Sequence, residues 1–186
     1  MKTKLVKDLM IPLAAYATVA DSATLQEAVQ ALEDASARCS PGRPPCRAVL
    51  VLDADGQVVG KVGFVDVLRG LEPKYRSLME RRGMAHLGFT RQFLKGMVEQ
   101  YNLWEQPFEA ICRKASAGRV RDFMYAPAEG EVIEATATLD QAAHQIVMGH
   151  HQSLLVTEKG KVVGILRLSD LFAEVAERIK ACETKG

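Results

Sequence analysis

The sequence lacks the features that mark membrane proteins and disulfide-bonded secreted proteins. Four cysteines among 186 residues are too few and too scattered for a disulfide framework. No apolar run approaches the roughly 20 residues that a bilayer span needs, and the basic residues after Met1 precede no apolar signal-peptide core. The net charge of +1 gives no general attraction to nucleic acid. We therefore expect a cytoplasmic protein without membrane segments.

Motifs for catalysis are also missing. The chain has no Gly-x-Ser-x-Gly elbow, no Gly-x-Gly-x-x-Gly turn and no Walker-type phosphate loop. His144, His150 and His151 lie close in sequence, but six residues turn a helix by about 600°, which puts His144 and His150 on different faces. We interpret these histidines as polar cleft or surface residues. We expect no enzyme activity, no metal and no permanent cofactor.

The composition is that of an ordinary soluble globular protein. Hydrophobic residues make up 48% and charged residues 25% of the chain. A chain of this length buries roughly 70% of its unfolded surface. Its size therefore allows one compact domain or two small units packed together.

The clearest positive feature is an internal repeat. Residues 55–68 and 159–171 match at a constant offset of 104 residues. The matched pairs are Gly56 with Gly160, Gly60 with Gly164, and Asp66 with Asp170. Such self-similarity indicates a duplicated structural unit.

Further matches precede these stretches at an offset of 114 residues. Val6–Met10 resembles Val120–Met124. Thr24 with Glu27, and Thr138 with Gln141, have the spacing of a capping box at a helix N-terminus. Apolar residues follow each cap at helical spacing, so we expect each helix to bury one face.

Each copy continues with two short apolar runs separated by a glycine turn, which predicts a hairpin, and then with a final helix. The predicted fold class is α/β (α+β), with two β-α-β-β-α units in residues 1–71 and 120–182. The first copy is ten residues longer, and the extra length holds the Cys39–Cys46 loop. We favour two thiols on a surface insertion there, with a redox bridge or half a metal site as the alternatives.

Residues 72–119 have no counterpart in the other copy. Apolar residues from Phe93 to Tyr101 repeat at helical spacing, and Pro107 suits the first position of a further short helix. The interval 73–95 is rich in lysine and arginine. A solvated helix face is the favoured interpretation; contact with a protein partner, with ligand phosphate or with nucleic acid remains open, and nucleic acid is the least expected.

The doubled motifs resemble the tandem cystathionine-β-synthase-type domain, or CBS pair. The residues that carry this resemblance are Val6–Met10, Gly60 to Asp66, Val120–Met124 and Gly164 to Asp170. The resemblance implies two copies packed through their strands, a flat homodimer, and clefts that bind AMP, ADP, ATP or S-adenosylmethionine. It also implies a non-enzymatic sensor.

The resemblance places candidate ligand residues near each aspartate. Asp66 and Asp170 suit the hydroxyls of a ribose diol, although an aspartate in a first helical turn also complements the helix dipole without any ligand. The family usually has Thr or Ser three residues earlier, where this chain has Gly63 and Arg167. Arg167 is either a phosphate clamp or a solvated strand-end residue.

Two further candidates, Ala48 and Ser153, lie near positions where the family often has proline. The missing side chain at Gly63 makes Asp170 the favoured ligand edge of the two. The alternative is a structural or interaction module with degenerate sites, in which the helical insertion contacts a protein partner.

Overall fold

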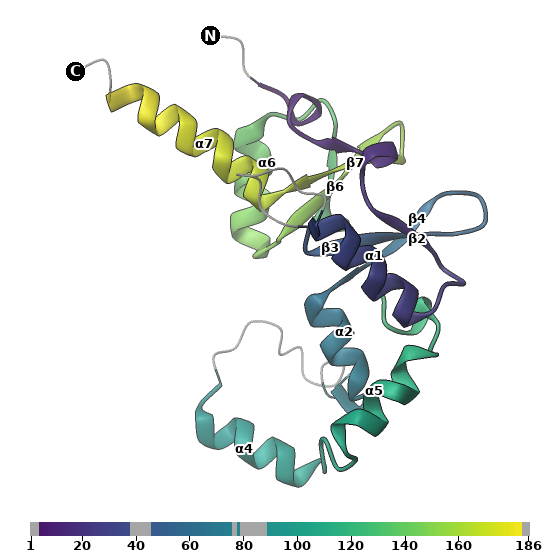
Figure 1. Cartoon of the computed structure of the whole chain (residues 1–186). Coiled ribbons are helices and arrows are strands. Elements are labelled where there is room, and N and C mark those ends of the chain that lie inside the picture. Colours follow the sequence, from purple (N-terminus) through teal and green to yellow (C-terminus); the bar gives the residue numbers. More distant parts are fainter. Residues whose placement is uncertain (1–3, 38–45, 76–77, 79–88, 184–186) are drawn as a thin grey trace.

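A computed structural model describes residues 4–37, 46–75, 78 and 89–183 of the chain (Figure 1). Two α/β units lie next to each other, and a helical segment extends from the first unit. The predicted fold class is confirmed. Among the described residues, no helix is both long enough and apolar enough to cross a membrane.

The first unit contains a three-stranded sheet in the order β2-β3-β4. Its elements are β2 (Thr18–Ala20), α1 (Leu25–Ala37), β3 (Ala48–Leu52), β4 (Val58–Gly63) and α2 (Phe64–Leu71). β2 runs parallel to β3, and β3 forms the predicted antiparallel hairpin with β4. Gly56 turns this hairpin at φ 73°, a left-handed conformation that favours glycine.

The second unit repeats this order. Its elements are β5 (Val132–Glu134), α6 (Leu139–Gly149), β6 (Ser153–Glu158), β7 (Lys161–Arg167) and α7 (Leu168–Glu183). β5 is parallel to β6, and β6 is antiparallel to β7. A fourth strand, β1 (Ile11–Pro12), pairs with β7, so the sheet order is β1-β7-β6-β5.

Val6–Met10 and Val120–Met124, which we call the opening motifs, each pack on the unit that they do not directly precede in the chain. Val6, in the 3₁₀ helix η1 (Val6–Asp8), is fully buried in the core of the second unit. Val120, in η3 (Val120–Asp122), is fully buried in the core of the first unit. Two more 3₁₀ turns, η2 (Leu13–Ala15) and η4 (Glu129–Glu131), follow the motifs. Each unit is therefore completed by a segment that precedes the other in the chain.

This crossing explains the second matched glycine of the repeat. A Cβ atom on Gly164 would lie 2.5 Å from the carbonyl oxygen of Ile11, because β1 runs directly beside it. A Cβ atom on Gly60 would lie 2.6 Å from the sulfur of Met124. The crossing segment occupies the space of a side chain at both positions, with its backbone at Gly164 and mainly with the more adaptable Met124 side chain at Gly60.

Gly164→Ala is expected to lower the free energy of unfolding by about 1–3 kcal/mol, because the new methyl group must displace the backbone of β1. Gly96→Ala is a suitable control, since no atom lies within 4 Å of a Cβ added there and Gly96 is inside a helix. Urea denaturation of the wild type and the two variants measures the change in the free energy of unfolding that each substitution causes. Equal stability of Gly164→Ala and the wild type would contradict the explanation.

The predicted cap is complete at α1, whereas at α6 only the half made by Gln141 is present, because the buried Thr138 hydroxyl has no hydrogen-bond partner among the described residues. The Thr24 hydroxyl accepts the backbone N–H of Glu27 at 3.2 Å, and the Glu27 carboxylate accepts the N–H of Thr24 at 2.7 Å. In the second unit the Gln141 side chain accepts the N–H of Thr138 at 3.0 Å. The caps begin α1 and α6 at the residues that the sequence predicts.

The two sheets pack against each other through a third apolar cluster. Leu50 of β3 lies against Leu155 of β6 and Ile165 of β7, and all three are buried. Cys46 belongs to this cluster and is 8% exposed, so the expectation of a surface thiol is wrong for Cys46. It lies two residues before β3, where the chain enters the contact between the units. Cys39 lies outside the described residues.

The insertion forms α4 (Arg91–Gln100) and α5 (Phe108–Ser116), with Pro107 at the N-cap of α5 rather than at its first position. The Trp104 indole donates to the Tyr75 hydroxyl at 3.0 Å and its ring lies beside Phe108. α4 buries none of its own residues and extends away from both sheets (Figure 1). Much of the basic interval lies outside the described residues.

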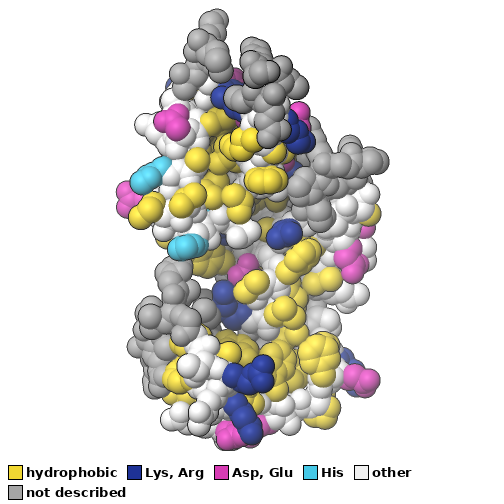
Figure 2. Space-filling view, turned by 90° about the vertical axis from the view of Figure 1, so that its left-hand side faces the viewer, with side chains coloured by type: hydrophobic (Ala, Val, Ile, Leu, Met, Phe, Trp, Pro, Cys, Tyr) yellow, Lys and Arg dark blue, Asp and Glu magenta, His cyan; other side chains and the backbone are white. Residues whose placement is uncertain are grey.

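The apolar stripes of α6 and α7 are buried only in part. Ala142, Ile146 and Leu171 are buried, but Val147 is 67% and Phe172 is 68% exposed. Figure 2 shows apolar side chains gathered on this side of the molecule. α6 thus buries one face, as predicted, but Val147 of its predicted apolar set lies outside that face.

Candidate ligand clefts between the two units

Both aspartates lie in the first turn of a helix, at the contact between the units. Asp66 is in α2 and Asp170 is in α7, each directly after the last strand of its hairpin. Groups of the opposite unit lie near each of them: Tyr16 and Cys46 near Asp170 and its partner Arg167, and Glu131 near Asp66. We name the surroundings of the two carboxylates the Asp66 cleft and the Asp170 cleft.

Arg167 occupies the Asp170 cleft. Its Nε atom donates to Oδ2 of Asp170, and its Nη2 atom donates to Oδ1, both at 2.6 Å. The Arg167 side chain is only 8% exposed, which rules out a solvated strand-end residue. Its Nη1 atom lies 3.8 Å from the Cys46 sulfur of the first unit. The hydrogen bonds that Arg167 donates to Asp170 raise the pKa of Arg167, so its guanidinium stays charged.

The first unit supplies the other wall of this cleft. The Tyr16 hydroxyl donates to the carbonyl oxygen of Ala48 at 2.9 Å. Burial raises the pKa of Tyr16 well above its usual value, and the nearby Cys46 adds to this effect. Tyr16 is therefore a neutral hydrogen-bond donor beside the Arg167–Asp170 pair.

Asp66 has weaker partners than Asp170. Its Oδ2 atom accepts the backbone N–H of Gly63 at 2.9 Å, and its Oδ1 atom accepts Nη1 of Arg69 at 3.1 Å. Gly63 leaves no side chain in the cleft. Burial raises the pKa of Asp66, although the Gly63 N–H, Arg69 and Lys61 act in the opposite direction. The carboxylate of Asp66 thus has free lone pairs beyond these two hydrogen bonds.

A buried ion pair lies next to Asp66. Lys61 of β4 pairs with Glu131 of η4, and both side chains are largely buried. The Lys61 Nζ atom also lies 5.4 Å from the centre of the Tyr125 ring. Burial acts to raise the pKa of Glu131, but hydrogen bonds from Lys61 and Tyr125 outweigh it and lower the pKa. The hydrogen bond to Glu131 raises the pKa of Tyr125 to about 12.

Sequence reasoning missed this group of three residues. One signal was available, because Lys61 follows Gly60 within a strand that is otherwise aliphatic, where the second copy has Ile165. Glu131 and Tyr125 carry no such signal. They reach Lys61 only because the second opening motif crosses to the first unit, where Tyr125 bridges to β4.

Ala48 and Ser153 occupy equivalent positions at the starts of β3 and β6. Ala48 pairs with Gly63, and Ser153 pairs with Arg167. Each therefore pairs, across its hairpin, with the residue that lies three positions before Asp66 or Asp170. The five predicted site residues all lie at the two clefts, where their contact with a ligand remains a prediction.

The described residues line at least two hollows, and neither of the two includes Asp66 or Asp170. One of about 640 Å³ is an open groove along α6, lined in part by His144, Gln145 and His151. The other, of about 430 Å³, lies between α5 and the end of α2. Within the described part of the chain, no three His, Cys, Asp or Glu side chains are grouped to hold a metal.

Asp66→Asn is expected to keep the stability of the wild type at pH 7 to within about 1 kcal/mol. Because the folded pKa of Asp66 is raised, wild-type stability falls as pH rises from the unfolded value of 3.8 through the folded pKa. The variant lacks this decrease, and its amide oxygen still accepts the Gly63 N–H. Urea denaturation between pH 3.5 and pH 7 checks both expectations. A large loss of stability at pH 7 would contradict them.

Comparisons with known proteins agree with this architecture. The CBS domain family matches residues 6–73 and 120–177, more than half of the chain. A search of curated proteins found no match.

Solved structures share the fold across nearly the whole chain. The structure of CBSX2 in complex with AMP is 18% identical, covers 93% of this chain and 97% of its own, and has a TM-score of 0.58. A putative acetoin utilization protein (AcuB) from Vibrio cholerae is 16% identical, covers 99% and 98%, and has a TM-score of 0.61. A CBS domain-containing protein of unknown function from Bacillus anthracis is 18% identical, covers 94% of both chains, and also reaches 0.61. From the family match and the doubled β-α-β-β-α unit, the chain belongs to the CBS domain family, as a tandem pair.

Proposed function

We propose that the protein is a non-enzymatic regulatory module that binds an adenosyl ligand, such as AMP, ADP, ATP or S-adenosylmethionine, between its two units. The observation that carries this proposal is the pair of carboxylates, Asp66 and Asp170, each at a helix N-terminus facing the opposite unit. A carboxylate accepts both hydroxyls of a ribose diol, and a helix N-terminus favours phosphate. Branched aliphatic strands supply flat apolar walls for an adenine ring.

The CBSX2 structure supports this proposal, because that protein was crystallised with AMP. Regulation follows if the ligand has different affinities for two conformations or assemblies of the module. The free thiol of Cys112 accords with a reducing compartment, and we place the module in the cytoplasm.

The test is a ligand panel of AMP, ADP, ATP, S-adenosylmethionine and NAD, measured by thermal shift and calorimetry. A ligand at 100 times its Kd stabilises the folded state by about 2.7 kcal/mol. For a protein of this size, that corresponds to a rise in Tm of roughly 5–10 °C. No stabilisation by any compound at millimolar concentration would reject the proposal.

We also propose that two copies associate through the helices. Large apolar side chains are exposed on α2, α6 and α7: Phe64, Val65, Leu68, Val147, Met148, Phe172, Val175 and Ile179. Figure 2 shows apolar side chains gathered on this face of the molecule, and exposed apolar patches of this kind often mark protein interfaces. The two units present related helices, as a self-complementary two-fold interface requires. Analytical ultracentrifugation should show a dimer for the wild type and monomers for Phe172→Glu.

A second function is favoured by α4. Phe93, Leu94 and Val98 on this helix are 38–48% exposed, and none of its residues is buried. An apolar helix face of this kind suits a protein partner, so the module would act through its insertion with both clefts empty. This function would be favoured over the first by two results together. A co-purifying partner would be lost in Leu94→Ser/Val98→Ser but kept in Gln92→Ser, and no compound of the ligand panel would bind.

A further inference from the structure

The two clefts differ at one position that the repeat makes directly comparable. Gly63 and Arg167 each end the second strand of a hairpin and each lie three residues before the cleft aspartate. Gly63 pairs across its hairpin with Ala48, and Arg167 pairs with Ser153. The same backbone site therefore has no side chain in one cleft and a long cationic one in the other.

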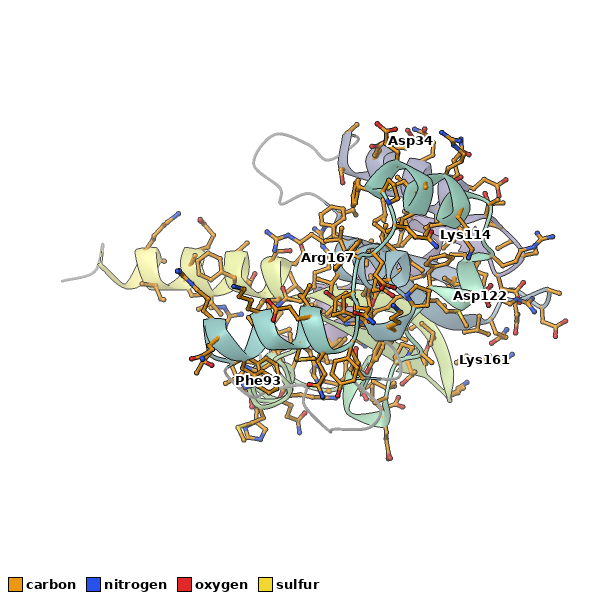
Figure 3. All side chains as sticks on the ribbon, turned by 90° about the horizontal axis from the view of Figure 1, so that it is seen from below. Asp34, Phe93, Lys114, Asp122, Lys161 and Arg167 are labelled. Atoms are coloured by element: carbon orange, nitrogen blue, oxygen red, sulfur yellow. The ribbon has the colours of Figure 1, made fainter. Side chains whose placement is uncertain are left out.

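Arg167 already gives Asp170 what a ribose would give. A ribose diol presents two adjacent hydroxyl donors to a carboxylate, one for each oxygen. The guanidinium presents two N–H donors in a rigid fork, and both reach Asp170 oxygens at 2.6 Å. The Arg167 side chain is buried and extends toward Cys46 of the first unit; Figure 3 shows it near the middle of the molecule. A ligand at Asp170 would have to displace this pair and leave a buried cation without its counterion.

Asp66 has no such internal competitor. One of its oxygens accepts a backbone N–H, a bond that leaves a lone pair available. The other accepts Arg69, whose side chain is 33% exposed and can turn toward solvent. The Tyr125 ring lies in the same cleft and is 37% exposed, which offers a flat surface beside the carboxylate.

We propose that Arg167 permanently occupies the Asp170 cleft, so that each chain binds one adenosyl ligand, at Asp66. This inference rests on the proposed function and specifies which of its two clefts is used. It reverses the order expected from sequence, in which the absence of a side chain at Gly63 favoured Asp170. In the folded chain Arg167 supplies both donors to Asp170, whereas Gly63 gives Asp66 only its backbone N–H.

The test uses AMP as the probe and calorimetry to measure stoichiometry and Kd. The wild type is expected to bind one AMP per chain. Asp66→Asn should weaken this binding by about tenfold or more, because the charged acceptor of the diol is lost. Glu158→Gln, at the exposed end of β6, is the control and should bind like the wild type.

The decisive variant combines Asp66→Asn with Arg167→Thr. Threonine supplies the hydroxyl that the family usually has at this position and removes the internal competitor, so binding of one AMP should return. Adding Asp170→Asn to this double variant should abolish AMP binding again. Thermal unfolding confirms that each variant is folded, and Arg167→Gln replaces Arg167→Thr if the threonine variant is not.

The outcomes separate the inference from the function on which it rests. Two AMP molecules per wild-type chain, or unchanged affinity in Asp66→Asn, would overturn the inference while leaving nucleotide binding intact. A folded double variant that binds no AMP would also overturn the inference. If neither the wild type nor any variant binds any member of the ligand panel, the proposed function itself fails.

Discussion

Replacing Leu50 by alanine is expected to lower the free energy of unfolding by about 2–5 kcal/mol. Leu50 is fully buried and lies between the two sheets, against Leu155 and Ile165 of the other unit. The substitution leaves a cavity whose walls belong to two rigid sheets, so the surrounding structure has little freedom to collapse into it. Urea denaturation followed by circular dichroism measures the loss.

The shape of the unfolding transition shows whether the two units unfold together. Because Leu50 joins the units, we expect one cooperative transition that moves to lower denaturant without splitting. Gln57→Ala, on the exposed turn of the same hairpin, should change stability by no more than about 0.5 kcal/mol. Two separate transitions in the wild type, with Leu50→Ala affecting neither, would show that the units fold independently.

Glu131→Gln is expected to lower the free energy of unfolding by about 3–5 kcal/mol, because it leaves Lys61 buried without its counterion. The side chains of Lys61 and Glu131 are 15% and 6% exposed, so water has little access to replace the lost carboxylate. The double replacement Lys61→Ile/Glu131→Leu should recover most of this loss, since isoleucine is the residue that the second unit has at the equivalent position. A cost below 1 kcal/mol for Glu131→Gln would contradict the buried pair.

The same pair predicts how stability changes with pH. The folded pKa of Glu131 lies below its unfolded value of 4.5. Its contribution is therefore fully present above pH 4.5 and is lost as pH falls through the folded pKa. Glu131→Gln should lack this part of the acid-induced loss. Unfolding curves of both proteins between pH 3 and pH 7 provide the measurement.

Much of the fold could be predicted because its signals are local. Thr24 and Glu27 are three residues apart, and the bonds between them that begin α1 depend only on that spacing. Gly56 and Gly160 mark left-handed turns that few other residues adopt easily. The repetition of these signals at two constant offsets was sufficient to predict the order of elements and the position of each aspartate.

The environment of the clefts could not be predicted in the same way. Lys61 and Glu131 are far apart in sequence and meet because the opening motif before the second unit packs on the first. The loop composition around Cys46 predicts a surface insertion, yet Cys46 lies in the contact between the sheets. Such contacts depend on which unit receives each crossing segment, and no local pattern records that choice.

The sequence alone determined the duplicated β-α-β-β-α unit, its capped helices, its glycine turns and the two aspartates at helix starts, because hydrogen bonding within a turn and the period of apolar residues act over a few positions. Only the tertiary structure decided which charges are buried and how they are paired, because the energy of a buried charge depends on the group a few ångströms away. Packing brings Glu131 to Lys61 from the segment that precedes the other unit. It also buries Arg167 beside Cys46 of the first unit, where the guanidinium pairs with Asp170 three residues further along the chain.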